Sequence, residues 1–471
     1  MNIRKIDNPF AFIIFGASGD LAQLKIFPAL YSLAEQKRLP TEYTIVGFAR
    51  TQFSQESFKE LFAQSIRQKL KHEINEDLLA SLLEHVCYVN GNYDDPHSYQ
   101  NLKAAIVEKD QGRGWQKLVY LAIPPQLFGV TAKNFGALRE RDGEIKLILE
   151  KPLGTDAASA RHLFHEIGLH FNESEIYLLD HYLGKEAIQS ILSLRYANRM
   201  LNHMLSGKEI ANIQITAFEE LGVGKRLGYF DTVGIIKDMV QSHLLQVLAL
   251  ITMAIPVKET AESFQREKEN ILSALHFADK KKNSLVVGQY HSYQKESEQV
   301  ANSQTETFAA LTLFIDKLDW YNVPIFIRTG KKLAKRRTEV VIEFKKLPFQ
   351  KENLEPNRLI LNIQPEEKIE IQLLNKMGGS NMHFRTLSTS DSLACFGDDC
   401  LPEHGRLLMD ALRGERMFFL SFHEVLASWD LIDEIIAFGK SQNLPLISYP
   451  DGSSDVEDSH KIPAAYGFKW Y

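Results

Sequence analysis

The chain has 471 residues, of which 44% are hydrophobic and 24% are charged. This length exceeds what one small core supports, and the composition is that of an ordinary globular protein rather than a disordered or fibrous one. The net charge of −6 excludes a general attraction to nucleic acid or anionic membranes, so an anion site has to be a local basic cluster.

The first 150 residues alternate between short β-rich runs and helical patterns. Strands are predicted over 10–15, 44–48, 87–91, 117–123 and 145–150. Helices are predicted between them, over 21–38, 54–71, 76–84, 96–110 and 127–141. Such alternation implies a parallel sheet with helices on both faces.

The pattern changes after about residue 178. Helices are predicted over 185–204, 231–253, 264–275 and 421–440. Strands at short spacing, typical of an antiparallel sheet, are predicted over 210–218, 305–316, 324–328, 339–344, 358–364 and 368–374. We therefore expect an α/β domain over 1–178 and a larger α+β domain over 179–471.

A Gly-rich turn follows the first strand and opens a helix. Such a turn lets backbone N–H groups approach a pyrophosphate at the helix N-terminus. The spacing Gly-x-x-Gly-x-x-Ala departs from the commoner Gly-x-Gly-x-x-Gly, and a plain strand-to-helix turn is the alternative. The predicted cofactor-binding residues of this turn are Gly16, Ala17, Ser18, Gly19, Asp20 and Leu21.

Two further segments end predicted strands. Arg50 and Thr51 follow the second strand, where NAD-binding folds usually place an acid for the ribose 2′-hydroxyl. An arginine there suits a 2′-phosphate, so NADP is predicted; a solvated surface arginine is the alternative. Lys151, in Glu-Lys-Pro-Leu-Gly at 150–154, follows the fifth strand at the edge of the sheet where ligands bind. We expect it to face both cofactor and substrate.

The segment Asp-His-Tyr-Leu-Gly-Lys-Glu at 180–186 gathers a carboxylate, an imidazole, a phenol and an ammonium. This set predicts a site for a small anionic molecule, with Asp180 and His181 as an oriented proton handler. If the chain is helical from Tyr182 onward, Lys185 shares a face with His181. The alternative is a strand end followed by a helix start, with Asp180 as an N-cap.

Together these segments resemble the glucose-6-phosphate dehydrogenase family. The resemblance includes Gly-Tyr-Phe-Asp at 228–231, Gln-Ser-His-Leu-Leu-Gln at 241–246 and Ile-Arg-Thr-Gly-Lys at 327–331. It runs in one order from about residue 10 to about 375. It implies a Rossmann domain followed by a larger, mainly antiparallel domain that often forms dimers.

The resemblance also implies residue roles. His243 corresponds to the general base and Asp180 to the carboxylate that orients it. The residues that correspond to substrate ligands are Lys151, His181, Tyr182, Lys185, Glu219, Asp238, Lys331 and Arg336. The implied partners are glucose 6-phosphate, NADP with NAD as a second option, and a second copy of the chain as a homodimer or a dimer of dimers.

The chemistry suits these residue types. Oxidation of a sugar C1–OH to a lactone needs a base for the hydroxyl proton and an acceptor for the hydride, and requires no metal. An imidazole with an ordinary pKa of about 6.5 is a suitable base at neutral pH. A buried aspartate on its other nitrogen would fix the tautomer. The alternative for His243, inside an apolar helix, is a hydrogen-bonded core histidine.

The chain departs from the family pattern at three places. Gln23 stands where a lysine is common near the cofactor phosphates, which puts the strength of the NADP preference in doubt. Ser242 replaces an asparagine beside the base, and Leu178-Leu179 replaces a more polar pair. The competing functions are a non-catalytic paralogue, or another Rossmann sugar dehydrogenase with the same Glu-Lys-Pro motif.

The remaining signals point to no further site. Cys87, Cys395 and Cys400 are too few for a disulfide framework and fit a reducing compartment. Cys395, Cys400 and His404, with Asp398 and Asp399, match no common zinc spacing. The lysine run at 280–282 predicts a solvated turn. No apolar run is expected to approach the roughly 20 residues needed to span a membrane, so we predict a cytoplasmic protein without membrane or nucleic-acid partners.

Overall fold

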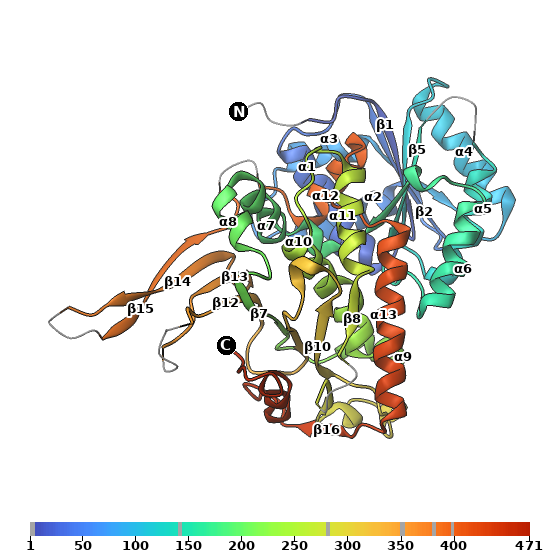
Figure 1. Cartoon of the computed structure of the whole chain (residues 1–471). Helices are drawn as coiled ribbons and strands as arrows, with labels where there is room; N and C mark the ends of the chain where they lie inside the picture. Colours follow the sequence, from blue (N-terminus) through green and yellow to red (C-terminus); the bar gives the residue numbers. More distant parts are fainter. Residues whose placement is uncertain (1–4, 140–143, 279–282, 349–353, 379–382, 397–399) are drawn as a thin grey trace. The chain divides into compact units, whose positions relative to one another are not determined.

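The computed structural model describes residues 5–139, 144–278, 283–348, 354–378, 383–396 and 400–471 (Figure 1). They belong to two compact units. The first holds 1–185, 260–265 and 395–425, and the second holds 186–259, 266–394 and 426–471. The predicted division into a domain over 1–178 and a domain over 179–471 stays a prediction. The first compact unit continues to Lys185 and takes in 395–425.

The first unit contains a six-stranded sheet in the order β3-β2-β1-β4-β5-β6, and all neighbouring pairs are parallel. Its central strands are buried on both faces, which explains their continuous apolar runs. The predicted α/β fold is confirmed. The strands are β1 Phe10–Phe15, β2 Tyr43–Ala49, β3 Val86–Asn90, β4 Gln116–Leu121, β5 Ile145–Glu150 and β6 Ile176–Leu179.

Helices cover both faces of this sheet. Figure 1 shows α4, α5 and α6 on one face and α1, α2, α3 and α12 on the other. Short polar side chains begin several of them: Ser54 caps α2, Asn75 caps α3 and Asp95 caps α4. The helices are α1 Phe27–Glu35, α2 Gln55–Lys69, α3 Glu76–Glu84, α4 Pro96–Asp110, α5 Phe128–Gly136, α6 Ala157–Gly168 and α12 Glu403–Arg413.

The second unit contains a ten-stranded sheet in the order β15-β14-β13-β12-β7-β11-β10-β9-β16, with β8 also paired to β10. All pairs are antiparallel except β7 with β11 and β9 with β16, so the predicted mainly antiparallel sheet is confirmed. Its strands are β7 Ile210–Phe218, β8 Leu275–Phe277, β9 Leu285–Tyr290, β10 Phe308–Ile315, β11 Ile325–Gly330, β12 Arg337–Phe344, β13 Arg358–Gln364, β14 Lys368–Lys376, β15 Phe384–Ser392 and β16 Leu446–Tyr449.

Two of the long predicted helices are broken. The helix expected over 185–204 is two helices, because Asn198 is extended between them. The helix expected over 231–253 has three parts, with a sharp change of direction at Gly234 and a π-helical middle part named η6. The segments are α7 Glu186–Ala197, α8 Arg199–Met204, α9 Leu227–Ile235, η6 Ile236–Leu244, α10 Leu245–Thr252, α11 Ala261–Leu272, α13 Phe422–Ser441 and α14 Lys461–Ala464.

Taken together with its break at Gly234, the helical segment Leu227–Thr252 is long and apolar enough to cross a membrane by length and composition alone. The expectation that no apolar run reaches this length was therefore wrong. However, 89% of its most apolar window is buried inside the protein, as in the core helix of a globular protein.

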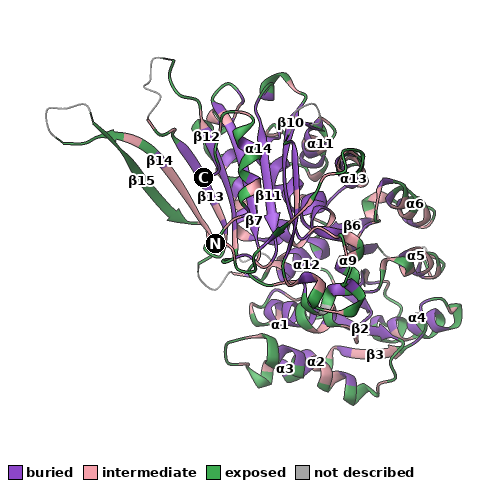
Figure 2. Cartoon of the chain, turned by 90° about the horizontal axis from the view of Figure 1, so that it is seen from below, coloured by how far each residue is buried: buried purple, intermediate pink, exposed green. Residues whose placement is uncertain are grey.

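The edge hairpin of the second unit is much less buried than the centre of its sheet. Figure 2 shows β15 in the colour of exposed residues and β7, β11 and β12 mostly in that of buried ones. All nine residues of β15 are exposed, and they include Phe384 and Leu387. A long exposed edge strand with apolar side chains is a surface on which another strand can pair.

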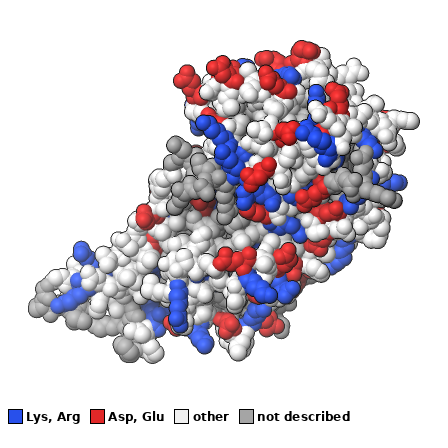
Figure 3. Space-filling model, turned by 90° about the horizontal axis from the view of Figure 1, so that it is seen from above, with Lys and Arg blue, Asp and Glu red and all other residues white. Residues whose placement is uncertain are grey.

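Charged side chains of both signs are interspersed on the face of the protein in Figure 3. The lysine run at 280–282, like Asp398 and Asp399, lies outside the described residues. Cys395 and Cys400 form a disulfide, and Cys87 is a free thiol. Three cysteines predict no disulfide framework, and this single pair, with Cα atoms 5.6 Å apart, was not anticipated from the sequence.

Candidate active site

The Gly-rich turn of the first unit is built for close backbone approach. Gly16 has φ +78°, and a Cβ there would lie 2.1 Å from the carbonyl oxygen of Ala122, so only glycine fits. At Gly19, a Cβ would meet only the carbonyl oxygen of Gly16 at 3.2 Å. The chain turns helical at Asp20. The lack of a side chain at Gly19, next to a helix start, fits the close approach of a dinucleotide pyrophosphate.

Two hydrogen bonds stabilise this turn. Ser18 Oγ and Thr51 Oγ1 are hydrogen-bonded at 3.1 Å, which joins the ends of the first two strands. Gln23 donates from Nε2 to the carbonyl oxygen of Ser18 at 2.8 Å. The residue that replaces the family's usual lysine thus supports the turn. Ala17 is buried, while Asp20 and Arg50 are exposed and Leu21 is half-buried.

Arg50 is available to an anion at the end of β2. Its guanidinium carbon lies 5.6 Å from the centre of the Tyr93 ring, which holds the charged group over an aromatic face. The Arg50 side chain is exposed beside Thr51, at the edge where parallel strands end. These two donors fit the extra phosphate that distinguishes NADP from NAD.

At the end of β5, Glu150 is the centre of a polar cluster within the first unit. The hydroxyl of Tyr120 donates to its carboxylate, and His404 Nε2 lies 3.0 Å from Glu150 Oε1. Full burial, together with the Glu150 charge, holds the pKa of Tyr120 well above its usual range. The half-buried Lys151 follows directly, so the cluster fixes the strand end from which this lysine extends.

The Asp180 segment follows β6 and begins with a cap. The fully buried Asp180 accepts a hydrogen bond at Oδ1 from the backbone N–H of Tyr182 at 2.9 Å. A 3₁₀ turn, His181–Gly184, follows, and Lys185 is extended with ψ 138°. The condition for Lys185 to share a helical face with His181, a helix from Tyr182 onward, is not met, because the 3₁₀ turn ends at Gly184. The alternative of Asp180 as an N-cap is confirmed, which does not exclude a catalytic role.

Lys185 is buried, and Glu403 is its ion-pair partner. Its Nζ also lies 5.3 Å from the centre of the Tyr182 ring. The ring of His181 packs edge-on against Tyr182, with centroids 5.2 Å apart. The three predicted phosphate ligands of this segment are therefore next to one another within the first unit.

Sequence reasoning missed the contribution of α12. Glu403 pairs with Lys185, His404 contacts Glu150, and Arg406 donates from Nη1 to the carbonyl oxygen of Gly184 at 2.6 Å. These residues lie more than 200 positions after the motifs that they contact. The signal in the sequence was a helix start, Leu-Pro-Glu-His at 401–404, which indicates a helix but not its neighbours. The cysteine pair and His404, considered above as metal ligands, are engaged in other contacts.

In the second unit, strand pairing brings two predicted residues together, and a third from η6 joins them. Phe218 of β7 is in register with Gly330 of β11 in a parallel pair, so the next residues, Glu219 and Lys331, leave the sheet side by side. The buried Lys331 forms an ion pair with Glu219, and its Nζ lies 3.4 Å from Asp238 Oδ2. The result is a cation flanked by two acids, which can hold sugar hydroxyls through both donors and acceptors.

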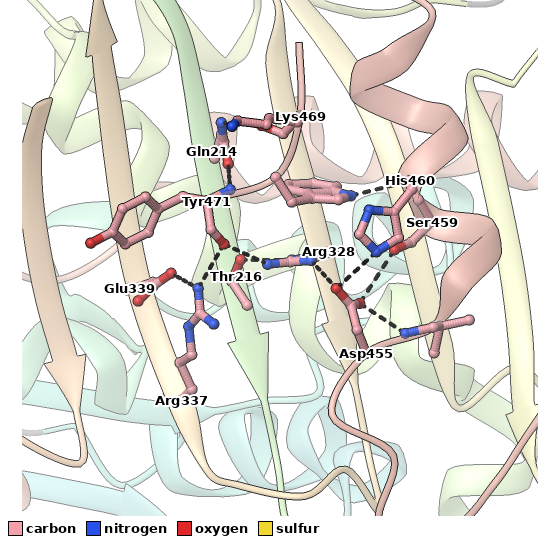
Figure 4. A network of polar contacts seen from close by, with 12 residues as sticks. Gln214, Thr216, Arg328, Arg337, Glu339, Asp455, Ser459, His460, Lys469 and Tyr471 are labelled. Atoms are coloured by element: carbon pink, nitrogen blue, oxygen red, sulfur yellow. Dashed lines mark hydrogen bonds and ion pairs between the residues drawn. The ribbon is translucent and has the colours of Figure 1, made fainter. Parts of the chain in front are cut away.

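A buried arginine holds the strands that carry Glu219 and Lys331 (Figure 4). Arg328 donates to Thr216 of β7 at 3.0 Å, to Asp455 at 2.7 Å and to the carbonyl oxygen of Tyr471. Its guanidinium lies 4.3 Å from the Trp470 ring centre. Burial lowers the pKa of Arg328 to about 10, so it stays charged at neutral pH.

The end of β16 and the turn that follows it hold the Lys331 loop directly. Tyr449 donates from its hydroxyl to the carbonyl oxygen of Lys331 at 2.7 Å. Gly452 donates from its backbone N–H to the carbonyl oxygen of Lys332 at 2.8 Å. Residues far along the chain thus orient this lysine. Arg336, by contrast, is exposed and donates to Gln364 at 3.1 Å.

His243 is buried within η6, the π-helical stretch that also carries Asp238. A π-helix closes its hydrogen bonds between residues five apart, and such stretches are frequent at functional sites. Asp238 and His243 are five residues apart, so they follow one another by about one turn. His243 belongs to the second unit and Asp180 to the first. The hydrogen bond between His243 and Asp180 stays a prediction. That His243 shares one active site with the phosphate ligands also stays a prediction.

Comparisons with known proteins agree with this arrangement. Residues 13–190 match the family "Glucose-6-phosphate dehydrogenase, NAD binding domain" and residues 192–471 match "Glucose-6-phosphate dehydrogenase, C-terminal domain". The glucose-6-phosphate 1-dehydrogenase 2 of Mycobacterium tuberculosis (strain ATCC 25618 / H37Rv) is 32% identical, over 99% of this chain and 95% of that protein. The glucose-6-phosphate 1-dehydrogenase of Bacillus subtilis (strain 168) is also 32% identical, over 98% and 97%.

Solved structures give the same result. A glucose-6-phosphate dehydrogenase in complex with its substrate glucose 6-phosphate matches with a TM-score of 0.92 and 30% identity, over 99% of both chains. A glucose-6-phosphate 1-dehydrogenase from Mycobacterium avium matches with a TM-score of 0.85 and 28% identity, over 98% of both chains. Both halves of the chain match the same family in sequence, and the fold agrees over nearly the full length: the chain belongs to the glucose-6-phosphate dehydrogenase family.

Proposed function

We propose that this member of the glucose-6-phosphate dehydrogenase family oxidises β-D-glucose 6-phosphate at C1 to 6-phosphogluconolactone, with His243 as general base and NADP as the preferred cofactor. The observation that carries the residue roles is the cluster of Lys331 with Glu219 and Asp238, beside the helix that contains His243. This cluster can hold the sugar hydroxyls while an imidazole on the same helical segment takes the C1 hydroxyl proton.

The base needs an imidazole in a defined tautomer. Asp180 is fully buried and its position is set by the cap bond to Tyr182. A carboxylate of this kind on one ring nitrogen of His243 would keep the other nitrogen ready to accept a proton. It would also stabilise the imidazolium that forms. When bound, NADP supplies the hydride acceptor, and the chain's own groups bind the sugar and move its proton.

The phosphate group of the substrate is assigned to the first unit. His181, Tyr182 and Lys185 are next to one another and supply an imidazole, a phenol and an ammonium. A phosphate dianion is bound by several such donors, and the charge-assisted bonds are stronger than neutral ones. Lys151, at the end of β5, is assigned to both sugar and cofactor.

The preference for NADP over NAD rests on Arg50 and Thr51 at the end of β2. One charge-assisted hydrogen bond contributes about 1.5–3 kcal/mol, which corresponds to a preference of about 10-fold or more. Gln23 stabilises the turn but carries no charge, so the field at the phosphates is weaker than a lysine would make it. NAD therefore remains a second, poorer cofactor.

The test is the ratio of kcat/KM for NADP to that for NAD, with glucose 6-phosphate and the absorbance of reduced nicotinamide as the readout. We expect a ratio of about 10 or more in the wild type and a value near one in Arg50→Ala. Arg113→Ala is the matched control, because Arg113 is also exposed and its guanidinium also lies over an aromatic ring, 5.0 Å from the centre of Trp115. An unchanged ratio in Arg50→Ala would leave Arg50 as a surface residue.

A homodimer, alone or as a dimer of dimers, is the proposed assembly. The support is β15, an edge strand whose nine residues are all exposed and which carries Phe384 and Leu387. Sedimentation of the wild type beside a Phe384→Glu/Leu387→Glu variant tests it, and a monomeric wild type would refute it. The cytoplasm stays the proposed location, which fractionation of cell extracts can test.

A further inference from the structure

The ion pair between Lys185 and Glu403 places an anion of the chain itself on the lysine assigned to the substrate phosphate. The lysine side chain is 6% exposed and the glutamate side chain 32% exposed. Glu403 is thus the accessible partner of an otherwise enclosed cation. Glu403 also lies in the first turn of α12, where the helix dipole favours a negative charge.

This pairing is held in place by the packing of α12 on the Asp180 segment. A Cβ at Gly184 would lie 2.7 Å from the carbonyl oxygen of Glu403 and 2.9 Å from Leu407 Cδ1, so the helix approaches the segment as closely as glycine permits. Arg406 donates to the carbonyl oxygen of Gly184 at 2.6 Å. The position of Glu403 is therefore fixed by backbone contacts and not by its own ion pair alone.

His404, the next residue, reaches the other substrate-side motif. Its Nε2 lies 3.0 Å from Glu150 Oε1, and its ring is nearly parallel to that of His181, with centroids 6.4 Å apart. The first turn of α12 thus contacts both the Glu-Lys-Pro segment and the Asp180 segment. Glu403, the acidic residue of this turn, therefore affects how strongly the site binds an anion.

A phosphate dianion that approaches Lys185 meets a cation already neutralised by a carboxylate. Binding has to displace Glu403 from Nζ or to share the ammonium with it, and both raise the free energy of the complex through like-charge repulsion. An anion without a sugar makes no other contacts that could offset this repulsion. A sugar phosphate can offset it, because its hydroxyl groups form additional hydrogen bonds with the protein.

We propose that Glu403 is a specificity-determining residue that competes with phosphate for Lys185, and thereby weakens the binding of free anions and sets the KM for the phosphorylated sugar. The inference rests on the proposed role of Lys185 as a phosphate ligand. Glu403 acts on phosphate binding and takes no part in the transfer of the proton or the hydride. Removal of the Glu403 charge therefore tightens phosphate binding and leaves kcat unchanged.

The central variant is Glu403→Gln, which keeps a hydrogen-bond acceptor for Lys185 and removes the charge. We expect the KM for glucose 6-phosphate, and the inhibition constant of inorganic phosphate against it, both to fall by about threefold to tenfold, as for one partly exposed charge pair. Glu403→Asp keeps the charge and should behave as wild type. Glu415→Gln is the matched control, because Glu415 lies just beyond the far end of α12 and pairs with Arg413 at the surface.

A second measurement does not depend on turnover. A ligand that binds the native state raises its melting temperature by an amount that grows with affinity. Inorganic phosphate alone should raise the melting temperature of Glu403→Gln more than that of wild type or of Glu415→Gln. This readout also shows whether each variant is folded.

Lys185→Ala separates this inference from the function on which it rests. If Lys185 binds phosphate, the variant loses activity on glucose 6-phosphate far more than on glucose, and Glu403→Gln has no further effect in that background. If that selective loss appears but Glu403→Gln leaves the KM and the phosphate inhibition constant unchanged or raised, the competition is refuted and Lys185 keeps its role. If Lys185→Ala loses activity equally on both sugars, the role of Lys185 fails and the competition fails with it.

Discussion

Gly234→Ala should destabilise the second unit and disturb the segment that carries His243. Gly234 has φ 73° and ψ 170°, a region of backbone conformation open essentially only to glycine, at the junction of α9 and η6. A Cβ there would lie 2.3 Å from Glu306 Oε1 and 2.7 Å from its carboxyl carbon. Glu306 cannot simply move away, because its Oε1 accepts the backbone N–H of Ile236 at 3.3 Å.

The magnitude follows from two separate effects. A non-glycine residue in this conformation costs about 1–3 kcal/mol. Steric overlap in a packed site costs a further 1–3 kcal/mol or so. Partial relaxation makes a total of about 3 kcal/mol the expectation, and for a unit of this size that corresponds to a melting temperature about 6–12 °C lower. The kcat should fall as well, because Asp238 and His243 follow within ten residues.

Differential scanning calorimetry and the steady-state kinetics of the same preparations provide the assay. Gly228→Ala is the control in the same helix, since a Cβ at Gly228 would meet only Gln299 Oε1, at 3.8 Å. It should be neutral or stabilise by up to about 1 kcal/mol. Adding Glu306→Ala to Gly234→Ala should recover the steric part and not the backbone part. If Gly234→Ala melts and turns over like Gly228→Ala, the strain argument is refuted.

Burial raises the pKa of Glu306 to about 7, and Lys237 opposes this shift. The native state then holds its proton between about pH 4.5 and 7 while the unfolded state does not, so stability falls as pH rises through this window. At pH 8 we expect Glu306→Gln to be more stable than wild type by about 1–2 kcal/mol, a value reduced for the partial exposure of the side chain. Near pH 4.5 the two proteins should be equally stable. A stability difference that does not change with pH would contradict this. His243→Asn should lower kcat by about 10²–10⁴-fold with little change in the KM for glucose 6-phosphate, and near wild-type turnover would place the base elsewhere.

The parallel sheet could be predicted because its signals are local. Each strand is a short apolar run, each helix has its own period and caps, and right-handed crossovers leave few ways to connect them. The cofactor turn and the segment at 150–154 follow predicted strands, so their place at one edge of the sheet followed from the strand assignment. The strand β6 that precedes 180–186 was predicted only as the alternative for that segment. Roles of single residues came from the family resemblance rather than from periodicity.

Other features could not be recognised from the sequence. The break at Gly234 could not be read from the sequence, because an apolar run over 231–253 has the composition of one continuous helix. Lys185 is extended and not helical, because only one 3₁₀ turn follows Asp180. The strand partner of β7 has no local signal in the sequence, because Ile213 pairs with Ile325, far along the chain.

The sequence by itself determined which residues are chemically equipped for phosphate, sugar and nucleotide, and which elements carry them. Only the tertiary structure decided that Lys331 leaves the sheet beside Glu219, and that Glu403 and His404 join motifs more than 200 residues earlier. The physical reason is that propensity and periodicity act over a few residues, whereas the pairing of distant segments is decided by how their surfaces pack together.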